Sequence, residues 1–381
     1  MTLSVQRGFG GICIRALVFL LCLGWSIPGA ATSLAEQCNI GISKFTYSLA
    51  VSDEGIMAAV EEAATGAVLA IYGPDGTAFK RWSAPDGRSF EYCEISGEYV
   101  LATYGAGVAL FSDYGRKQEW GRRFADLWGY ACSLDTVEQR VIAADYPLDG
   151  SSTVWAISFS GTVLWQHNLP SLVTDTAICE AGHVAVAGEQ YGLMLDKGRH
   201  AVYLLSPTGT EQWHFETSSP AIDIAMSSDG LWLLAGLDNG GMVFLENRSR
   251  LLGREPRLLW SKDDIGGYVD LAADAGTAVA ATSDMDLALL SSSGEEIWTS
   301  GRRDVFGDRD EICISADGSL IAAVGLAMKW DDNPALIYAS TGNVLYESFS
   351  SSTRPSVAVS PNGRYVAVAS GFRLRLFEVK D

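Results

Sequence analysis

The residue types that most often carry out chemistry are few in this chain and are not spaced for it. The four histidines are His167, His183, His200 and His214. None follows the His-x-His or His-x3-His spacing that places two imidazoles on one metal ion. No nucleophile elbow, phosphate-binding loop or calcium-loop motif occurs in the sequence. We therefore expect scattered surface histidines, and the sequence predicts no enzyme activity, no catalytic residue, no metal site and no cofactor.

The cysteines also favour packing over reactivity. Cys93, Cys132, Cys179 and Cys313 each fall in a short apolar run, where related runs carry alanine. Cysteine in such a place is typical of a small buried apolar side chain. Equivalent places in successive repeats are expected to lie too far apart for a disulfide. These four are predicted to be buried thiols, and Cys38 has no evident mate.

The residues best suited to binding lie in loops whose length varies from repeat to repeat. Carboxylates and aromatic side chains alternate there, and binding residues concentrate on variable loops carried by a rigid frame. The candidate binding face consists of Asp145, Tyr146, Asp149, Glu189, Tyr191, Asp238, Asp284, Asp286, Trp330, Asp331 and Asp332. The alternative is that these loops are acidic only because the chain is, with a net charge of −19. Such a surface excludes nucleic acid and suits a basic partner or a cation.

These loops belong to a sequence repeat that occurs eight times in the chain. Each copy has an apolar run, a Gly-bearing turn such as Asp229-Gly230 or Asn362-Gly363, and a second run rich in β-branched residues. The copies begin at residues 49, 92, 131, 177, 222, 269, 312 and 357. This spacing is the period of a four-stranded propeller blade and not of a helical solenoid.

A third run and a fourth run complete each repeat. The fourth run ends in an aromatic residue, at Trp82, Trp120, Trp165, Trp213, Trp260, Trp298 and Tyr346. The sequence therefore predicts an all-β fold, an eight-bladed β-propeller of four-stranded antiparallel blades. Large rings at one repeat position are expected to be buried wedges between blades.

The eighth repeat lacks an aromatic-ended fourth run. Residues 37–42 lie at the spacing that this strand would need, so an N-terminal strand is expected to close the ring and remove two open sheet edges. In such a ring the variable loops share one face, the top face, with the connections between blades.

The first residues have the pattern of a leader. Arg7 and Arg15 precede an uncharged run at 16–27 and small residues up to Ala35. This order predicts a signal peptide over residues 1–35, with cleavage after Ala31 or Ala35, and an uncleaved membrane anchor is the alternative. Residues 36–381 would then form a single exported domain, extracellular, on the cell surface or periplasmic, and we expect a monomer.

Two repeat families resemble these units. The Ser-x-Asp-Gly turn at 227–230 and the run Tyr-Val-Ala-Val-Ala-Ser at 365–370 are similar to WD40-type repeats. Residues 204–213, ending in Trp213, resemble the quinoprotein (PQQ-like) repeat with its tryptophan-docking pattern. The combination is most similar to exported PQQ-like/WD40-like repeat proteins of prokaryotes. This resemblance implies the fold and leaves the activity open.

Three functions compete on this basis. The favoured one is a non-enzymatic exported scaffold that binds protein or cell-envelope components through the acidic top face. A propeller like the outer-membrane protein assembly factors is an alternative, although no small residue precedes Cys22 or Cys38 as a lipoprotein cleavage site requires. A quinoprotein dehydrogenase is the third, but such enzymes are longer and resemble chains with an adjacent Cys-Cys pair, which this sequence lacks.

Overall fold

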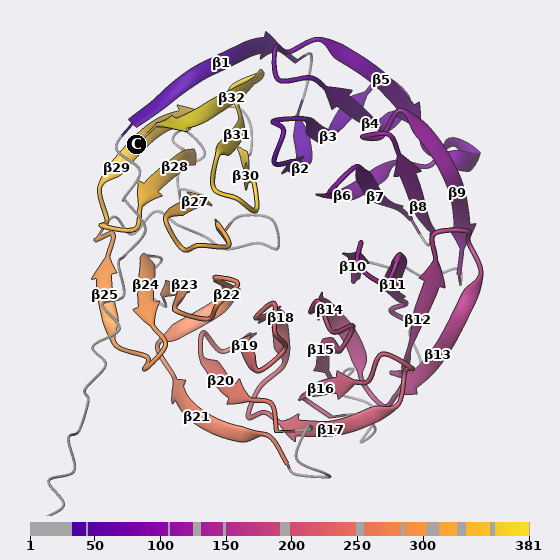
Figure 1. The fold of residues 1–381 in the computed structure, drawn as a ribbon, viewed down its shortest axis with the longest axis vertical. Helices are drawn as coiled ribbons and strands as arrows, with labels where there is room; N and C mark the ends of the chain where they lie inside the picture. The colour runs from indigo at the N-terminus through magenta and orange to yellow at the C-terminus, as the bar shows by residue number, and fades with distance from the viewer. Residues whose placement is uncertain are drawn as a thin grey trace, which may run out of the picture.

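The computed structural model is a ring of eight four-stranded antiparallel sheets around a central channel (Figure 1). It describes residues 33–42, 45–105, 107–124, 131–147, 150–190, 199–248, 255–282, 286–301, 312–325, 333–350 and 355–380. Within these residues, no helix is long and apolar enough to cross a membrane. The all-β, eight-bladed fold predicted from the repeats is confirmed.

The blades follow the chain in order, and each begins with the strand nearest the channel. The first four blades comprise β2 (Thr46–Val51), β3 (Met57–Ala63), β4 (Gly66–Tyr72) and β5 (Ala78–Ser83); β6 (Phe90–Ser96), β7 (Tyr99–Tyr104), β8 (Gly107–Ser112) and β9 (Lys117–Arg123); β10 (Cys132–Asp135), β11 (Arg140–Ala144), β12 (Ser152–Ser158) and β13 (Val163–Leu169); and β14 (Leu172–Ile178), β15 (Val184–Glu189), β16 (Ala201–Leu205) and β17 (Glu211–Glu216).

The remaining blades repeat this order with one exception. They comprise β18 (Ala221–Met226), β19 (Trp232–Leu237), β20 (Met242–Glu246) and β21 (Arg257–Lys262); β22 (Ile265–Leu271), β23 (Thr277–Thr282), β24 (Leu287–Ser291) and β25 (Glu296–Thr299); β26 (Ile312–Ile314), β27 (Leu320–Val324), β28 (Asn333–Ala339) and β29 (Val344–Ser350); and β30 (Ser356–Val359), β31 (Tyr365–Ser370), β32 (Arg373–Lys380) and β1 (Ser33–Gly41).

The exception is the eighth blade, which the N-terminal strand completes. β1 pairs antiparallel with β32, from Ser33 opposite Lys380 to Gly41 opposite Arg373. Figure 1 shows the two strands side by side on the outer rim. The expected closing strand at residues 37–42 is present, and it begins earlier than expected, at Ser33.

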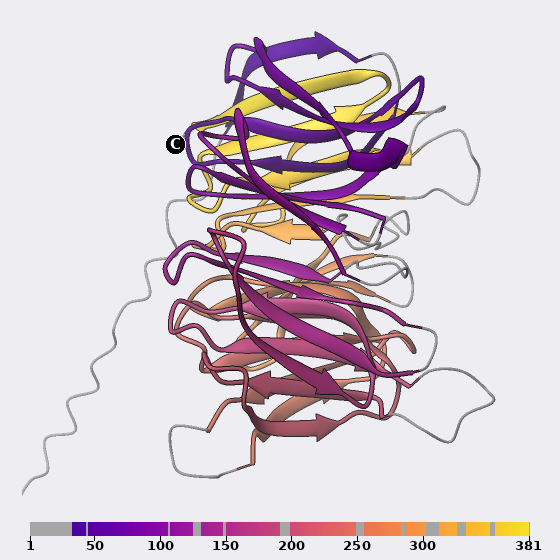
Figure 2. The same ribbon diagram turned by 90° about the vertical axis from the view of Figure 1, so that its right-hand side faces the viewer.

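The ring has two different faces. One face carries the second-to-third-strand loops, such as 63–66 and 238–241, and the links between blades, such as 84–89 and 263–264. It is the top face expected from the sequence, and we call it the connection face. The 3₁₀ helix η1 (Pro85–Gly87) lies there (Figure 2). The opposite face carries the first-to-second-strand and third-to-fourth-strand turns. This division is the one that the repeat pattern predicted.

Burial depends on the position of a strand within its blade. The middle strands have neighbouring blades on both sides, so β11, β27 and β28 are buried at every residue. The outer strands have solvent on one side, and β13 alternates between half-buried and exposed side chains over most of its length. Strands buried on both faces read as continuous apolar runs, as the second runs of the repeats do.

An aromatic side chain at the outer strand ties each of six blades to the next one. The indole Nε1 groups donate to oxygens in the third-to-fourth-strand turn of the following blade: Trp82 to Gly115 O at 2.7 Å, Trp120 to Phe159 O at 3.1 Å, Trp165 to Pro207 O at 2.9 Å, Trp213 to Asn247 Oδ1 at 3.1 Å, Trp260 to Ser292 O at 3.0 Å and Trp298 to Ser340 O at 2.9 Å. The predicted blade-to-blade role of these residues is confirmed.

The expected depth of burial was wrong for most of these rings. Trp213 is buried, but the other five indoles are half-buried because the outer strands border solvent. They therefore contribute less apolar burial than full wedges would, and the directed hydrogen bond is a larger part of their effect.

The eighth blade docks differently because a cysteine occupies the tryptophan position. Trp82 lies opposite Leu69 in its sheet, and Cys38 lies opposite the corresponding residue Leu376. Gly76 of the first blade has φ +81°, and a Cβ there would lie 3.2 Å from Cβ of Cys38. A small side chain and a close backbone approach replace the docked ring at the seam where the chain closes.

Backbone hydrogen bonds add a second set of links on the face opposite the connection face. Glu180 N donates to Ser228 O at 3.0 Å, and Ser228 N donates to Ala273 O at 2.9 Å. The series continues from Ala273 N to Ala316 O at 2.8 Å and from Ala316 N to Pro361 O at 2.9 Å. Successive first-to-second-strand turns are therefore joined directly from the fourth blade to the eighth.

The described cysteines are thiols, as expected, but they do not share one packing position. Cys93 and Cys132 lie opposite Ala102 and Ala143. Cys313 lies opposite Ala322, in the cross-strand row that ends at the outer aromatic residue Tyr346. Cys179 falls in a turn. Cys313 is half-buried, so the prediction of full burial was wrong there. Turn lengths differ between repeats, so residues that are aligned by sequence do not always occupy the same position in their blades.

Replacing Trp298 by Phe should remove the Nε1 donor while keeping a ring against Tyr338, whose centroid lies 5.4 Å away. We expect the free energy of unfolding to fall by about 1 kcal/mol, because the hydrogen bond to Ser340 is lost. Trp155→Phe is the control, because the Trp155 ring packs against Phe124 with a centroid distance of 4.7 Å and its indole makes no hydrogen bond within the described residues. Chemical denaturation measures both variants, and an equal loss in the two would contradict the docking role.

Candidate functional site

The innermost strand of each blade is a sheet edge that faces the channel, so part of its backbone has no partner in its own sheet. Four carboxylates on inner strands accept a hydrogen bond from a backbone N–H of the next blade. These bonds join Glu94 Oε1 to Leu134 N at 3.4 Å, Asp175 Oδ2 to Ile224 N at 3.1 Å, Asp223 Oδ2 to Val269 N at 2.8 Å and Asp270 Oδ2 to Ile314 N at 2.9 Å. The carboxylates therefore cap the strand edges around the channel.

Hydroxyl groups make the same kind of link at two other blade boundaries. Cys93 N donates to Ser48 Oγ at 3.1 Å, between the first and second blades. Ser133 Oγ donates to Thr176 O at 2.9 Å and lies 2.6 Å from Thr176 Oγ1, between the third and fourth blades. Each of these residues stands on the innermost strand of its blade.

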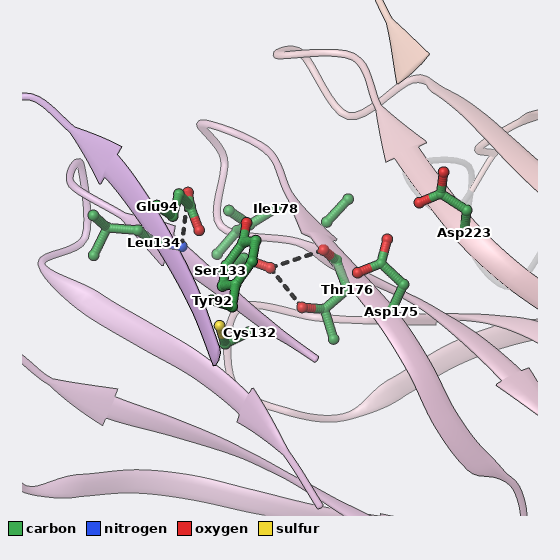
Figure 3. A pocket seen from close by; sticks show the side chains of 10 residues that line it. Tyr92, Glu94, Cys132, Ser133, Leu134, Asp175, Thr176, Ile178 and Asp223 are labelled. Carbon is green, nitrogen blue, oxygen red and sulfur yellow. Dashed lines mark hydrogen bonds between the residues drawn. The ribbon is translucent and has the colours of Figure 1, made fainter. Parts of the chain in front are cut away.

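A cavity of about 310 Å³ opens among the inner strands of the second to fifth blades. Figure 3 shows Glu94, Ser133 and Thr176 following one another along its wall, with Asp175 and Asp223 beyond them. Five of its ten lining residues are the polar side chains that link neighbouring blades, and the other five are apolar or aromatic.

Restricted access to water raises the pKa of two of the capping carboxyls. Burial raises the pKa of Glu94 to about 8, although the hydrogen bond from Leu134 N lowers it, and the charge of Asp175 adds to the rise. Burial likewise raises the pKa of Asp270 to about 6, against the hydrogen bonds from Ile314 N and Leu271 N. Both groups therefore lose their protons at a higher pH than a solvent-exposed carboxyl group does.

The carboxyl groups of the channel contribute to the stability of the ring. Each of its four carboxylates already accepts a backbone N–H of the next blade. Over the described ranges, no group of three His, Cys, Asp or Glu side chains is placed to hold a metal ion. The channel geometry accounts for edge capping and for a dependence of stability on pH.

The candidate binding residues predicted from the sequence occupy several different environments. Asp145 is buried, with 8% of its surface exposed, and its Oδ1 accepts Thr153 N at 2.7 Å. Tyr146 donates its hydroxyl proton to Glu189 across the boundary of the third and fourth blades. Asp145 therefore stabilises its own loop, and Tyr146 and Glu189 join two neighbouring blades.

Two more of the candidates are placed, and six are not. Asp238 is exposed on the connection face. Asp286 is half-buried, and its Oδ1 lies 3.5 Å from Ser300 Oγ. Among the five described candidates, Tyr146 and Glu189 are brought together by their hydrogen bond. Asp149, Tyr191, Asp284, Trp330, Asp331 and Asp332 lie outside the described residues.

Sequence reasoning missed two groups of acidic residues. The channel carboxylates stand singly within apolar runs, where an isolated acid is the signal that was available. Asp263 and Asp264 are exposed in the short link between β21 and β22. That link was not counted among the variable loops, although it lies on the same face.

Two of the histidines were expected to be scattered but share one partner. His214 Nδ1 lies 2.9 Å from Glu211 Oε1, and His167 Nε2 lies 3.8 Å from Glu211 Oε2. They meet because β13 and β17 are the outer strands of adjacent blades. His200 is used elsewhere, where its Nδ1 accepts Gln190 N at 3.0 Å.

Comparison with known proteins supports the fold. No protein-family model and no curated protein sequence matches the chain. Among solved structures, the C-terminal WD40 domain of Sif2 is similar with a TM-score of 0.66 at 15% identity, over 93% of this chain and 100% of that one. The computationally designed Ika8 protein has a TM-score of 0.65 at 15% identity, over 90% and 99% of the two chains.

A third similar structure is the β-propeller domain of Cps50 (Swd1) from Myceliophteria thermophila. Its TM-score is 0.59 at 12% identity, over 92% of this chain and 99% of that one. The chain is thus an eight-bladed propeller similar in structure to WD40 propellers. At these identities the likeness concerns the fold alone.

Replacing Glu94 by Gln should change how stability depends on pH. The raised pKa of Glu94 means that its contribution is complete below the unfolded-state pKa and is lost as pH rises toward about 8. Glutamine keeps an acceptor for Leu134 N and cannot ionise, so the variant should gain melting temperature relative to the wild type between pH 5 and 9. Thermal melts across this range measure the difference, and a constant offset between the two proteins would contradict it.

Proposed function

We propose that this protein is a non-enzymatic, exported scaffold that binds a protein partner or a cell-envelope component through its connection face. The fold supports this proposal, because β-propellers of the WD40 type commonly mediate protein interactions through residues carried on a rigid ring. The channel carboxylates are used within the ring, which directs attention to the outer faces.

The observation that carries the proposal is an acidic patch at the fifth blade, formed by Asp238, Asp263 and Asp264. All three residues are exposed. A Cβ added at Gly241 would lie 3.5 Å from Cα of Asp263, so the loop of Asp238 and the link to the next blade are adjacent. Three exposed carboxylates on adjacent short segments favour a basic partner.

Export rests on the predicted leader, and the register of the closing strand refines it. Ser33, Leu34 and Ala35 lie opposite Lys380, Val379 and Glu378. Cleavage after Ala31 would leave this pairing whole, whereas cleavage after Ala35 would remove it. We therefore favour processing before Ser33.

An outer-membrane protein assembly factor is a second candidate. The six indole hydrogen bonds between blades support it, because they match the tryptophan-docking pattern of PQQ-like repeats that such factors share. Deleting the gene should then lower the amount of folded outer-membrane protein, whereas a scaffold of another kind would leave that amount unchanged.

Neutralising the acidic patch tests the favoured function. Asp238→Asn, Asp263→Asn and Asp264→Asn together should weaken capture of a partner from envelope extract several-fold and reduce its dependence on salt, because the long-range attraction is lost. The melting temperature should not change, since the three side chains are exposed.

The matched control carries Glu98→Gln, Glu138→Gln and Glu180→Gln, which neutralise three exposed acids on the opposite face. This variant should capture the partner as the wild type does. Equal weakening in both variants, or in neither, would contradict binding through the connection face.

A further inference from the structure

We propose that a groove between the first and second blades binds a lysine or arginine side chain of the partner protein. This assignment rests on the scaffold function proposed above and gives it a second, specific contact. The groove lies on the connection face, between the hairpin at 63–67 and the start of β6, and has a volume of about 420 Å³. Tyr47, Phe90 and Glu91 contribute to its lining.

Glu91 provides a carboxyl group whose capacity to accept hydrogen bonds is only partly used within the described residues. Its Oε1 accepts Gly105 N at 3.3 Å, whereas its Oε2 is buried and has no hydrogen-bond partner among the described residues. Burial raises the pKa of Glu91, although Gly105 N and the charge of Arg88 lower it. A buried oxygen without a partner costs free energy, and a bound cation would offset that cost.

Two of the side chains that line this groove stand at β-bulges, which also occur in the innermost strands of other blades. Thr46 lies opposite Glu61 and Ser48 opposite Val60, so Tyr47 is the extra residue of a β-bulge. Glu91 is the extra residue of a second bulge, between Phe90 and Tyr92. Bulges re-aim side chains and are frequent beside binding sites. Tyr47 is 52% exposed, so its ring is available to the stem of a long basic side chain.

An aromatic pair extends this surface toward the seam of the ring. The rings of Phe45 and Phe372 lie 6.2 Å apart, with 37% and 43% of their surfaces exposed. Phe45 is two residues before Tyr47, which limits the backbone separation to about 7 Å. The aromatic pair Phe45 and Phe372 therefore lies close to the groove, at the boundary of the eighth and first blades.

The backbone conformation of Phe372 is unfavourable for a bulky residue, so stability alone does not explain its exposed ring. Ser370 lies opposite Arg373, so Gly371 and Phe372 form a two-residue hairpin loop, with φ values of 59° and 61°. Such loops favour glycine or asparagine, and a bulky residue at positive φ is strained. Strain held in place beside an exposed aromatic pair is typical of a binding surface.

These contacts together select the class of ligand. The buried carboxylate oxygen, which has no hydrogen-bond partner among the described residues, favours a cation. The largely apolar groove accommodates an aliphatic stem, and the flanking rings accept an apolar neighbour. A lysine or arginine beside an apolar residue in an extended segment meets all three requirements. The net charge of −19 would attract such a segment.

The test uses immobilised nonapeptides with apolar flanks and a central lysine or arginine. The reference peptides carry norleucine at the centre, which keeps the aliphatic stem and lacks the charge. The wild type should bind the basic peptides about tenfold more tightly than the reference, as expected for one charge-assisted contact. Glu91→Gln should abolish this preference while keeping an acceptor for Gly105 N, and Glu98→Gln on the opposite face should preserve it.

Melting temperatures separate a binding role from a structural one. Glu91→Gln should melt at the same or a higher temperature, because it removes a buried charge, and Phe372→Gly should melt higher while binding all the peptides more weakly. A wild type that does not prefer basic peptides, a Glu91→Gln variant that still does, or a clear fall in its melting temperature would each overturn the proposal. If the acidic patch of the fifth blade still governs partner capture, the scaffold function stands without this groove; if neither matters, both proposals fail.

Discussion

The ring depends on side chains that cross from one blade to the next. Each blade is a complete sheet with its own hydrogen-bonded ladder, and none of the ladders among the described residues continues from one blade into the next. The indole Nε1 groups make the crossing at the outer rim, and the carboxylates and hydroxyls of the inner strands make it at the channel. These two sets act at opposite edges of the blades, so together they fix the angle at which neighbouring sheets pack.

The difference between these two sets of contacts explains which features could be predicted from the sequence and which could not. The period, the Gly-bearing turns and the aromatic ends of the fourth runs gave the fold, the closing strand and the docking role of residues such as Trp298. They depend on local spacing. The capping role of Asp223 and Asp270 depends on which backbone N–H of another blade comes within reach, and that is a property of the assembled ring.

The candidate binding face shows the same limit. The parts of its loops that the structure describes, at Asp145, Glu189 and Asp238, lie on the connection face, because strand order decides on which face a loop lies. Asp145, Tyr146 and Glu189 were chosen for their types, but the loops and the seam between blades use them. The exposed acids Asp263 and Asp264 and the strained Phe372 were missed, since exposure and a positive φ are visible only once the strands are paired. The connection face thus combines a rigid frame with exposed acidic residues, such as Asp263 and Asp264.

The closing strand offers the most direct test of this account, because the seam between the eighth and first blades lacks a docked indole and depends on β1. Hydrogen exchange and thermal melting can be compared for a chain that begins at Ser33 and one that begins at Ile42. Without β1, the amides of β32 and β2 should exchange much faster, and the melting temperature should fall by roughly 5 °C or more. Unchanged exchange in β32 and an unchanged melting temperature would contradict closure of the ring by its N-terminal strand.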